Sequence, residues 1–276
     1  MRTDTVRQWM DKRGNAGKLG MAGLVLALGV TAGVDRAHHP KPAGDTPSTV
    51  IAHLLPSTPA VLSVDGNASA EKTASADVTW DLPDLNHPRV DMWVGKFTTG
   101  FRDDFATYLD HMADFQPMIS AKLAARGMPQ DLLYLALIES GGNPKAYSSA
   151  KASGLWQFIE GTAERYGLKV DGKVDERNDP AKETDAALRY LTDLHDRFGS
   201  WYLAAAAYNT GEGRVAKVMM EVTGHERGTD EDYYRISEKL PAETRDYVPK
   251  MIAAARIAKE PAKYGFDVAA TGSAGS

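Results

Sequence analysis

The sequence contains no cysteine. This absence excludes a disulfide framework, a thiolate metal site, a cysteine nucleophile and a lipid-modified cysteine anchor. An excess of positive charge is also lacking: the formal net charge is −5, which argues against a partner that is a nucleic acid. No glycine loop has phosphate-binding spacing, and no internal repeat is present. The composition, 43% hydrophobic and 25% charged, is that of an ordinary globular protein.

A basic leader and a short uncharged segment stand at the N-terminus. Residues 1–18 are rich in Lys and Arg, and residues 19–34 carry no charge. The pattern predicts a signal peptide or an N-terminal membrane anchor over residues 1–34. A cleaved signal and a retained anchor both fit, because the run is shorter than the roughly 20 residues of a full membrane span. The basic leading side predicts that residue 1 stays cytoplasmic, so we expect a periplasmic protein anchored in the inner membrane or exported.

Residues 35–84 are rich in Pro, Ala, Ser, Thr and Asp and show neither a helical nor an alternating period. Such a composition buries too little apolar surface to offset the entropy of ordering, so we expect a flexible linker. Such a linker would allow the domain to extend from the membrane to a polymer at some distance. Residues 269–276 form a short tail of mostly Ala, Gly and Ser, also expected to be disordered.

Residues 85–268 carry the hydrophobic pattern of a folded domain, with little strand-like alternation. The pattern predicts an all-α, mainly helical fold with seven to nine helices in a single catalytic domain. Helical spacing of apolar residues is clearest over residues 101–125, 131–138, 181–198, 201–209 and 248–258.

Glu139 is the most informative residue of this domain. It follows the almost entirely apolar residues 132–138, which predict a buried helix, and it precedes Gly141 and Gly142, which end that helix. Burial and the negative end of the helix dipole both raise the pKa of such a carboxyl group. A general acid near neutral pH needs a raised pKa. The alternative is a solvent-facing or Arg-paired glutamate at a helix end.

A polar, turn-forming stretch follows, over residues 140–149, and residues 154–158 read Gly-Leu-Trp-Gln-Phe. Hydroxyl groups, an amide and an indole close to an acid are the mixture that sugar recognition needs. We therefore expect this stretch to form the wall of a cleft. Trp156 is predicted to line the groove because Gly154 and Gln157 flank it, whereas Trp201 is predicted to lie in the core.

Other chemistries find little support. His111 and His195 fall on helical patterns and are interpreted as surface or packing residues, so we expect no metal and no cofactor. Ser140 has no His and Asp partners arranged for a hydrolytic triad. The acidic cluster around Asp175 and Asp179 is interpreted as a solvated loop before a helix.

Three ordered motifs carry a resemblance to a known family. They are Glu139-Ser140, the Gly-Leu-Trp-Gln-Phe segment at 154–158, and Ala-Tyr-Asn-Thr-Gly-Glu-Gly at 207–213. Together they resemble the goose-type lysozyme and soluble lytic transglycosylase (SLT) family, which implies the lysozyme-like fold. The sequences of residues 154–158 and 240–248 are similar to those of the membrane-bound lytic murein transglycosylase D branch. That branch usually carries C-terminal LysM repeats, which we do not find in this sequence. We expect the tether, that is, the membrane attachment with the flexible linker, to take the place of these repeats in bringing the domain to the polymer.

The resemblance implies roles for individual residues. Glu139 matches the catalytic acid/base of the family. Lys151 stands where the family usually has Gly, so we expect the loop around it to run differently. Residues matched to or expected in the sugar-binding groove are Ser148, Gln157, Tyr208, Asn209, Trp156 and Glu243.

The implied activity is non-hydrolytic cleavage of the β-1,4 bond between N-acetylmuramic acid and N-acetylglucosamine, which yields 1,6-anhydromuramic ends. The implied partners are peptidoglycan glycan strands, the inner membrane through the N-terminal segment, and a cell-wall or secretion machinery. Two alternatives stay open. One is a goose-type muramidase that adds water with the help of a second carboxylate. The other is a non-catalytic scaffold that binds peptidoglycan.

Overall fold

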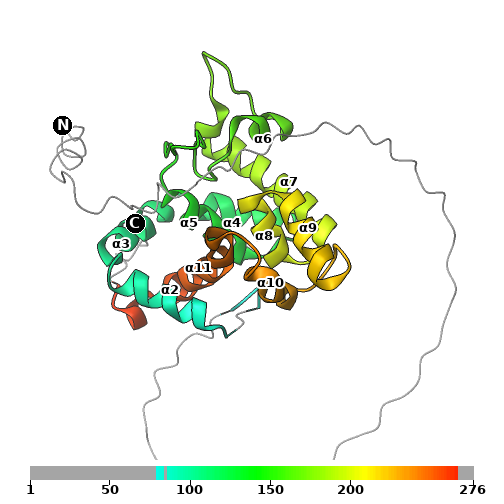
Figure 1. The fold of residues 1–276 in the computed structure, drawn as a ribbon. Coiled ribbons are helices and arrows are strands. Elements are labelled where there is room, and N and C mark those ends of the chain that lie inside the picture. The colour runs from blue at the N-terminus through cyan, green and yellow to red at the C-terminus, as the bar shows by residue number, and fades with distance from the viewer. Residues whose placement is uncertain (1–78, 84–85, 267–276) are drawn as a thin grey trace, which may run out of the picture. The chain divides into compact units, whose positions relative to one another are not determined.

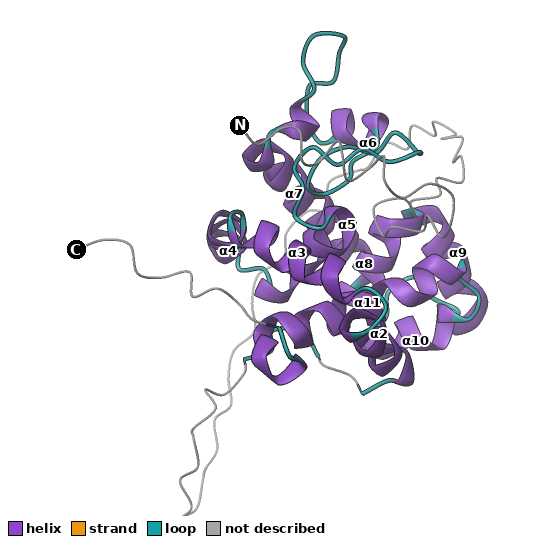
Figure 2. Ribbon diagram, turned by 90° about the vertical axis from the view of Figure 1, so that its left-hand side faces the viewer, coloured by secondary structure: helices purple, strands orange, loops and turns teal. Residues whose placement is uncertain are grey.

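The computed structural model describes residues 79–83 and 86–266. The predicted leader (1–34), nearly all of the predicted linker and the predicted tail (269–276) lie outside the described residues. Within the described ranges the chain forms ten α-helices, three short 3₁₀ helices and a few isolated β-bridges, and no strand (Figures 1 and 2). The prediction of an all-α fold is confirmed.

Most helices follow one another with short connections, and the longest connection, residues 141–159, joins α5 to α6. In chain order they are α2 (Pro88–Thr98), α3 (Arg102–Ala113), α4 (Gln116–Ala125), η2 (Gln130–Leu132), α5 (Leu133–Ser140), α6 (Glu160–Arg165), η3 (Glu176–Asn178), α7 (Pro180–Phe198), α8 (Trp201–Thr210), α9 (Glu212–Thr223), α10 (Asp230–Ser237), α11 (Ala242–Lys259) and η4 (Pro261–Tyr264).

The number of helices exceeds the predicted seven to nine for two reasons. The helical stretch predicted over 101–125 is divided into α3 and α4, and Pro117 stands in the first turn of α4, where proline starts a helix more easily than it continues one. In addition, four of the eight residues of α10 are charged, so its apolar face is short. Helix α9 was not among the predicted helices either, although its buried residues Val215, Ala216, Val218 and Met219 stand at helical spacing.

The core surrounds α5, α8 and α11, which lie near the centre of the domain (Figure 1). Helix α11 packs against α2, α5 and α8, and α8 packs in turn against α7 and α9. Every residue of α5 is buried, and the four alanines at 204–207 of α8 have no exposed surface, which allows the neighbouring helices to approach closely. The C-terminal end of α5 is therefore held rigidly in the domain.

Residues 79–83 were assigned to the linker by sequence, and this assignment is wrong for the last residues before the domain. The backbone N–H groups of Asp81 and Leu82 donate to Asp131 Oδ2 at 2.9 and 3.1 Å, and Leu82 is buried in the core. Lys259 pairs with Asp131, donates to the carbonyl oxygen of Thr79 at 2.6 Å and lies over the Trp80 ring. A buried acid on the domain thus binds the segment that precedes it.

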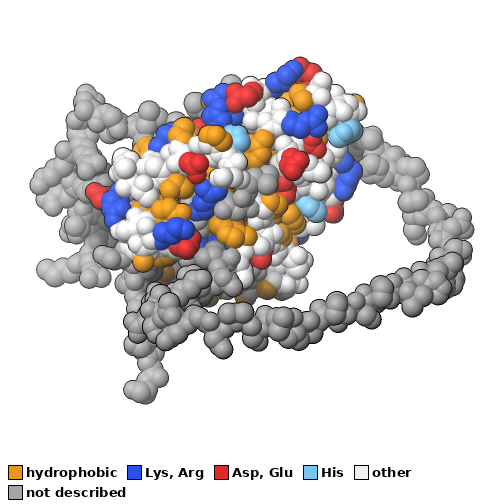
Figure 3. Space-filling view, turned by 90° about the horizontal axis from the view of Figure 1, so that it is seen from below, with side chains coloured by type: hydrophobic (Ala, Val, Ile, Leu, Met, Phe, Trp, Pro, Cys, Tyr) orange, Lys and Arg blue, Asp and Glu red, His pale blue; other side chains and the backbone are white. Residues whose placement is uncertain are grey.

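The surface of the described domain is polar and mixed in charge. On the face drawn in Figure 3, side chains of Lys and Arg alternate with those of Asp and Glu, with hydrophobic side chains between them. Among the helices that the structure describes, none combines the length and apolarity needed to span a membrane.

Candidate active site

Glu139 lies in the last turn of α5, as predicted, and is 8% exposed. The helix ends at Gly141, whose φ of 60° is the left-handed conformation that favours glycine. The ring of Tyr108 lies 2.4 Å from the position that a Cβ atom of residue 141 would occupy, so a larger residue would collide with it. The glycine therefore both ends the helix and allows α3 to cover the chain next to the acid.

The carboxyl group of Glu139 accepts a hydrogen bond from the Tyr247 hydroxyl, with 2.5 Å between the two oxygens. Burial raises the pKa of Glu139 to about 7, and the charge of Glu243 acts in the same direction. The Tyr247 hydrogen bond and the charge of Lys250 oppose this rise. Glu139 consequently has the pKa of a group that is partly protonated at neutral pH and can both donate and accept a proton.

The loop between α5 and α6 follows this acid and is held by two isolated β-bridges, Tyr147 with Ser153 and Ser153 with Phe158. Ser148 is buried, and its Oγ accepts the backbone N–H of Ala152 at 3.0 Å. Gln157 is also buried and donates its side-chain amide to the carbonyl oxygens of Ala146 and Gly154. In this structure both predicted groove residues stabilise the loop through contacts with its own backbone.

Trp156 does not line a groove, and this prediction is wrong. The side chain has no exposed surface, and its Nε1 donates to Thr184 Oγ1 of α7 at 3.0 Å. The cause is Glu183, a buried residue of α7 whose two carboxyl oxygens accept the backbone N–H groups of Leu155 and Trp156 at 2.6 and 2.9 Å. These bonds draw the loop onto α7 and place the indole in the core.

Lys151 shows how the loop accommodates a departure from the family pattern. Its φ is 63°, which is the left-handed conformation that glycine adopts most readily. Its carbonyl oxygen accepts a hydrogen bond from the Arg177 side chain at 2.9 Å. The loop thus keeps a glycine-type backbone at this position although a lysine occupies it.

Two predicted residues of the third motif, Tyr208 and Asn209, lie on α8, and the predicted Glu243 lies on α11. Tyr208 donates its hydroxyl to the carbonyl oxygen of Trp156 at 2.8 Å, and burial, followed by the charge of Glu139, raises its pKa. Asn209 donates to Glu243 at 3.3 Å and accepts from the Thr244 hydroxyl at 2.7 Å. Burial also raises the pKa of Glu243. The structure therefore brings Tyr208, Asn209 and Glu243 into one network next to the acid.

Three residues of the site were missed by the sequence interpretation: Tyr247, Lys250 and Glu183. Glu243, Tyr247 and Lys250 follow one another at spacings of four and three, so they lie on one face of α11. This spacing could have been recognised in the sequence. The role of Glu183 could not, because its hydrogen-bond partners are backbone N–H groups of a loop 27 and 28 residues away.

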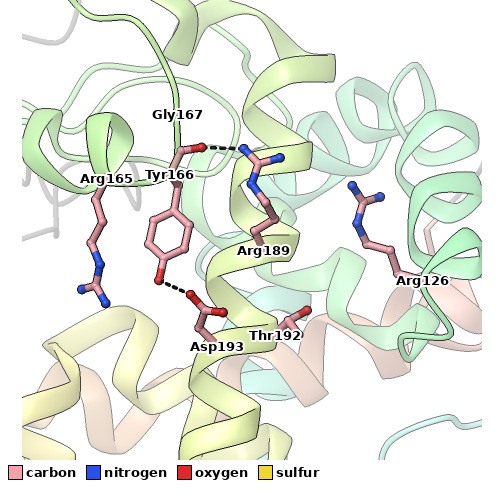
Figure 4. Close-up of a pocket in the computed structure, with 7 residues that line it drawn as sticks. All are labelled: Arg126, Arg165, Tyr166, Gly167, Arg189, Thr192 and Asp193. Atoms are coloured by element: carbon pink, nitrogen blue, oxygen red, sulfur yellow. Dashed lines mark hydrogen bonds between the residues drawn. The ribbon is translucent and has the colours of Figure 1, made fainter. Parts of the chain in front are cut away.

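A cavity of about 770 Å³ lies elsewhere, between α4, the end of α6 and α7 (Figure 4). Its walls include Arg126, Arg165 and Arg189, and Tyr166 donates its hydroxyl to Asp193 at 2.9 Å across it. Glu139 is not among its lining residues. Most of the positive charge in this cavity is neutralised, because Asp185 pairs with Arg126 and Glu212 pairs with Arg165. Among the described residues, no group of His, Asp and Glu could hold a metal ion.

The fold and site define an all-helical domain organised around one buried carboxyl group that can gain or lose a proton near neutral pH. More particularly, residues 116–229, which contain the three motifs, match the family described as Transglycosylase SLT domain.

Named relatives agree with this assignment. The chain is 42% identical over 148 residues to the membrane-bound lytic murein transglycosylase D of Escherichia coli (strain K12), which covers 53% of this chain and 32% of that protein. It is 34% identical over 147 residues to the peptidoglycan transglycosylase of Escherichia phage T7, covering 52% of this chain and 10% of that one. Identity to the soluble lytic murein transglycosylase of Escherichia coli (strain K12) is 29% over 156 residues, covering 52% of this chain and 23% of that one. The chain thus spans about a third of the first relative's length and less of the other two.

Proposed function

We propose that this chain is a lytic transglycosylase that cleaves the β-1,4 bond between N-acetylmuramic acid and N-acetylglucosamine in peptidoglycan. The observation that carries the proposal is the position of Glu139: it lies in the last turn of a fully buried helix, is 8% exposed, and receives the Tyr247 hydroxyl on one carboxyl oxygen, while burial raises its pKa to about 7. The relatives named as murein and peptidoglycan transglycosylases support the choice of substrate.

In the proposed mechanism Glu139 acts first as acid and then as base. Protonated Glu139 donates its proton to the bridging oxygen as the bond from that oxygen to C1 of the muramic sugar breaks. The carbonyl oxygen of the 2-acetamido group stabilises the cationic C1. The resulting carboxylate of Glu139 then removes the proton from the 6-hydroxyl group of the same sugar, and that oxygen bonds to C1. The nucleophile is already positioned within the substrate, so the reaction gains a high effective concentration without water.

The network around Glu139 fits these two steps. Tyr247 donates to Oε1, which leaves the second oxygen for proton transfer and stabilises the carboxylate that forms after donation. Tyr208 and Asn209 then belong to the walls that position the sugar, and Ser148 and Gln157 support the loop that completes the site.

Glu243 supports the second candidate function, a muramidase that adds water. Its charge acts on Glu139, and it is half-buried beside Asn209, where a second carboxylate could activate a water molecule. We favour the transglycosylase because the relatives are named as transglycosylases, and because one carboxyl oxygen of Glu243 already accepts a hydrogen bond from the Asn209 side chain.

Mass spectrometry of muropeptides released from bacterial sacculi tests the proposal. The full chain should release 1,6-anhydro products, which are lighter than reducing-end products by one water. The Glu139→Gln variant should release none, and Glu243→Gln should still give anhydro ends. Reducing-end products that depend on Glu243 would establish the muramidase. Absence of both products, with intact binding to sacculi, would establish the scaffold.

The organisation of the rest of the chain is part of the same proposal. We propose that residues 1–34 hold the protein in the inner membrane or export it, and that the linker lets the domain over residues 85–268 reach the periplasmic glycan. Fractionation of cells that produce the full chain tests this, since a cytosolic location would contradict it.

A further inference from the structure

Two lysines of neighbouring helices converge on the Trp93 ring, and the charge of one of them, Lys250, acts on Glu139. Lys96 of α2 has its Nζ 4.1 Å from the centroid of the Trp93 ring, and Lys250 of α11 has its Nζ 4.7 Å from the same centroid. Lys250 lies one helical turn beyond Tyr247, on the face of α11 that contacts Glu139. Two ammonium groups therefore share one indole ring at the edge of the proposed active site.

Neither ammonium group has a carboxylate partner within ion-pairing distance among the described residues, whereas Lys122 and Lys182 form ion pairs of 2.6 Å elsewhere on the domain. Both lysines are half-buried. Burial lowers the pKa of Lys250, and the positive charge of Lys96 acts in the same direction. The two lysines thus repel each other in a place where water screens their charges only partly.

A structural role in covering Trp93 would need only one lysine. A cation over an indole ring is favourable, but a second cation on the same ring adds repulsion that the first did not have. The negative charges of Glu139, Glu243 and Asp246 favour the charged form of Lys250. Nevertheless, neither lysine forms a direct ion pair among the described residues, so the N–H donors of both ammonium groups are available to a ligand.

We propose that Lys96 and Lys250 form a subsite for a carboxylate of the substrate. The proposal rests on the proposed function, since peptidoglycan carries such groups next to the bond that Glu139 would cleave. The carboxylate belongs either to the peptide attached to N-acetylmuramic acid or, on peptide-free strands, to the lactyl arm of the sugar. Binding it would neutralise the repulsion between the lysines and would distinguish peptidoglycan from neutral polymers of N-acetylglucosamine.

Equilibrium binding in the Glu139→Gln background tests the subsite without cleavage. The full chain is titrated with three soluble ligands: peptide-bearing glycan strands, peptide-free glycan strands, and neutral chito-oligosaccharide. Lys96→Gln and Lys250→Gln should each weaken binding of an anionic ligand about tenfold, as expected for the loss of one charge-assisted hydrogen bond. Binding of chito-oligosaccharide should not change.

The controls separate charge from structure. Lys250→Arg should retain most of the affinity for the anionic ligand, and Lys263→Gln, which removes an exposed charge at the far end of α11, should change nothing. A loss confined to peptide-bearing strands would identify the peptide carboxylate, a loss confined to peptide-free strands would identify the lactyl carboxylate, and a loss on both would mean that the subsite accepts either group. Equal losses on charged and neutral ligands, or no loss on either, would overturn the subsite. Failure of the unsubstituted Glu139→Gln protein to bind any glycan would instead overturn the proposed function.

Discussion

Glu139 and Glu183 are both glutamates buried in this domain, and they differ in what their oxygens contact. Glu139 is 8% exposed and receives one hydrogen bond, from the Tyr247 hydroxyl. Glu183 has no exposed surface, and both of its oxygens accept backbone N–H groups. Burial raises the pKa of each, although the N–H groups oppose this rise for Glu183.

The comparison shows that burial and a raised pKa do not by themselves identify an acid catalyst. Glu183 has no oxygen left for a substrate, because Leu155 and Trp156 occupy both, and its effect is to fix the loop. Glu139 keeps one oxygen without a protein donor at the end of its helix. An available oxygen next to a small exposed surface is therefore the feature that separates a proton donor from a structural acid.

The largest expected effect follows from Glu139→Gln. Cleavage of sacculi should fall about 10³-fold or more, because general acid and base catalysis both depend on this group. The release of muropeptides measures it, and Glu231→Gln, an exposed change on α10, should leave the rate unchanged. A rate for Glu139→Gln within tenfold of the parent would remove Glu139 from its proposed role.

The same variant should gain stability at alkaline pH. The pKa of Glu139 in the folded protein is about 7, above its usual value of 4.5, so ionisation costs free energy in the folded state as the pH rises between these values. Above pH 7 the gain over the parent should approach about 3 kcal/mol, and below pH 4 it should vanish. Urea unfolding at pH 4 and pH 8 measures the difference, and a pH-independent effect would contradict the raised pKa.

Activity should decline with alkaline pH in a way that reports the same group. A protonated Glu139 is needed for the first step, so kcat/KM should fall about tenfold for each pH unit above about 7. Initial rates on purified glycan strands between pH 5 and 9 measure this limb. A decline that begins near pH 4.5 instead would mean that burial does not raise the pKa of the acid.

Glu183→Gln tests the other glutamate of the comparison, whose expected role is to hold the loop and not to transfer a proton. Glutamine can accept only one of the two N–H groups, and its own amide would face the other, so the free energy of unfolding should drop by about 2–4 kcal/mol. Urea unfolding measures the drop, and the exposed Glu160→Gln should change stability by less than about 0.5 kcal/mol. Full stability combined with lost cleavage would assign Glu183 a catalytic role that we do not expect.

Tyr247→Phe should have the smallest effect, a fall in kcat/KM of about tenfold from the loss of one hydrogen bond to the acid. Because that hydrogen bond lowers the pKa of Glu139, its removal should also move the alkaline limb of the pH profile upward. Tyr264→Phe, in η4 after the end of α11, is the control. A decrease in activity with an unchanged pH profile would mean that Tyr247 acts only through packing.

The sequence predicted those features that depend on local patterns. The apolar residues 132–138 and the glycines after them predicted a buried helix with Glu139 at its end, and the structure confirms both. The periodic residues of α7 and α8 were equally informative, because a continuous apolar face is visible without knowledge of the partner helix. The pattern of α10 was too charged to be recognised.

Features that depend on distant contacts were not predictable in this way. Trp156 was assigned to a groove from its neighbours Gly154 and Gln157, yet the hydrogen bond that its indole donates to Thr184 and the backbone hydrogen bonds that Glu183 accepts place it in the core. The segment at 79–83 has the composition of a linker, but the buried carboxylate of Asp131 binds it. In both cases a polar group from a remote helix decides the location.

The attachment of residues 79–83 at Asp131 also sets an orientation. Asp131 stands immediately before α5, and Glu139 is at the other end of that helix, so about 12 Å of rigid rod separates the point of attachment from the acid. Asp131 and Lys259 both bind this segment, so a pull along the proposed tether would act on the domain about one helix length from Glu139, at the opposite end of α5.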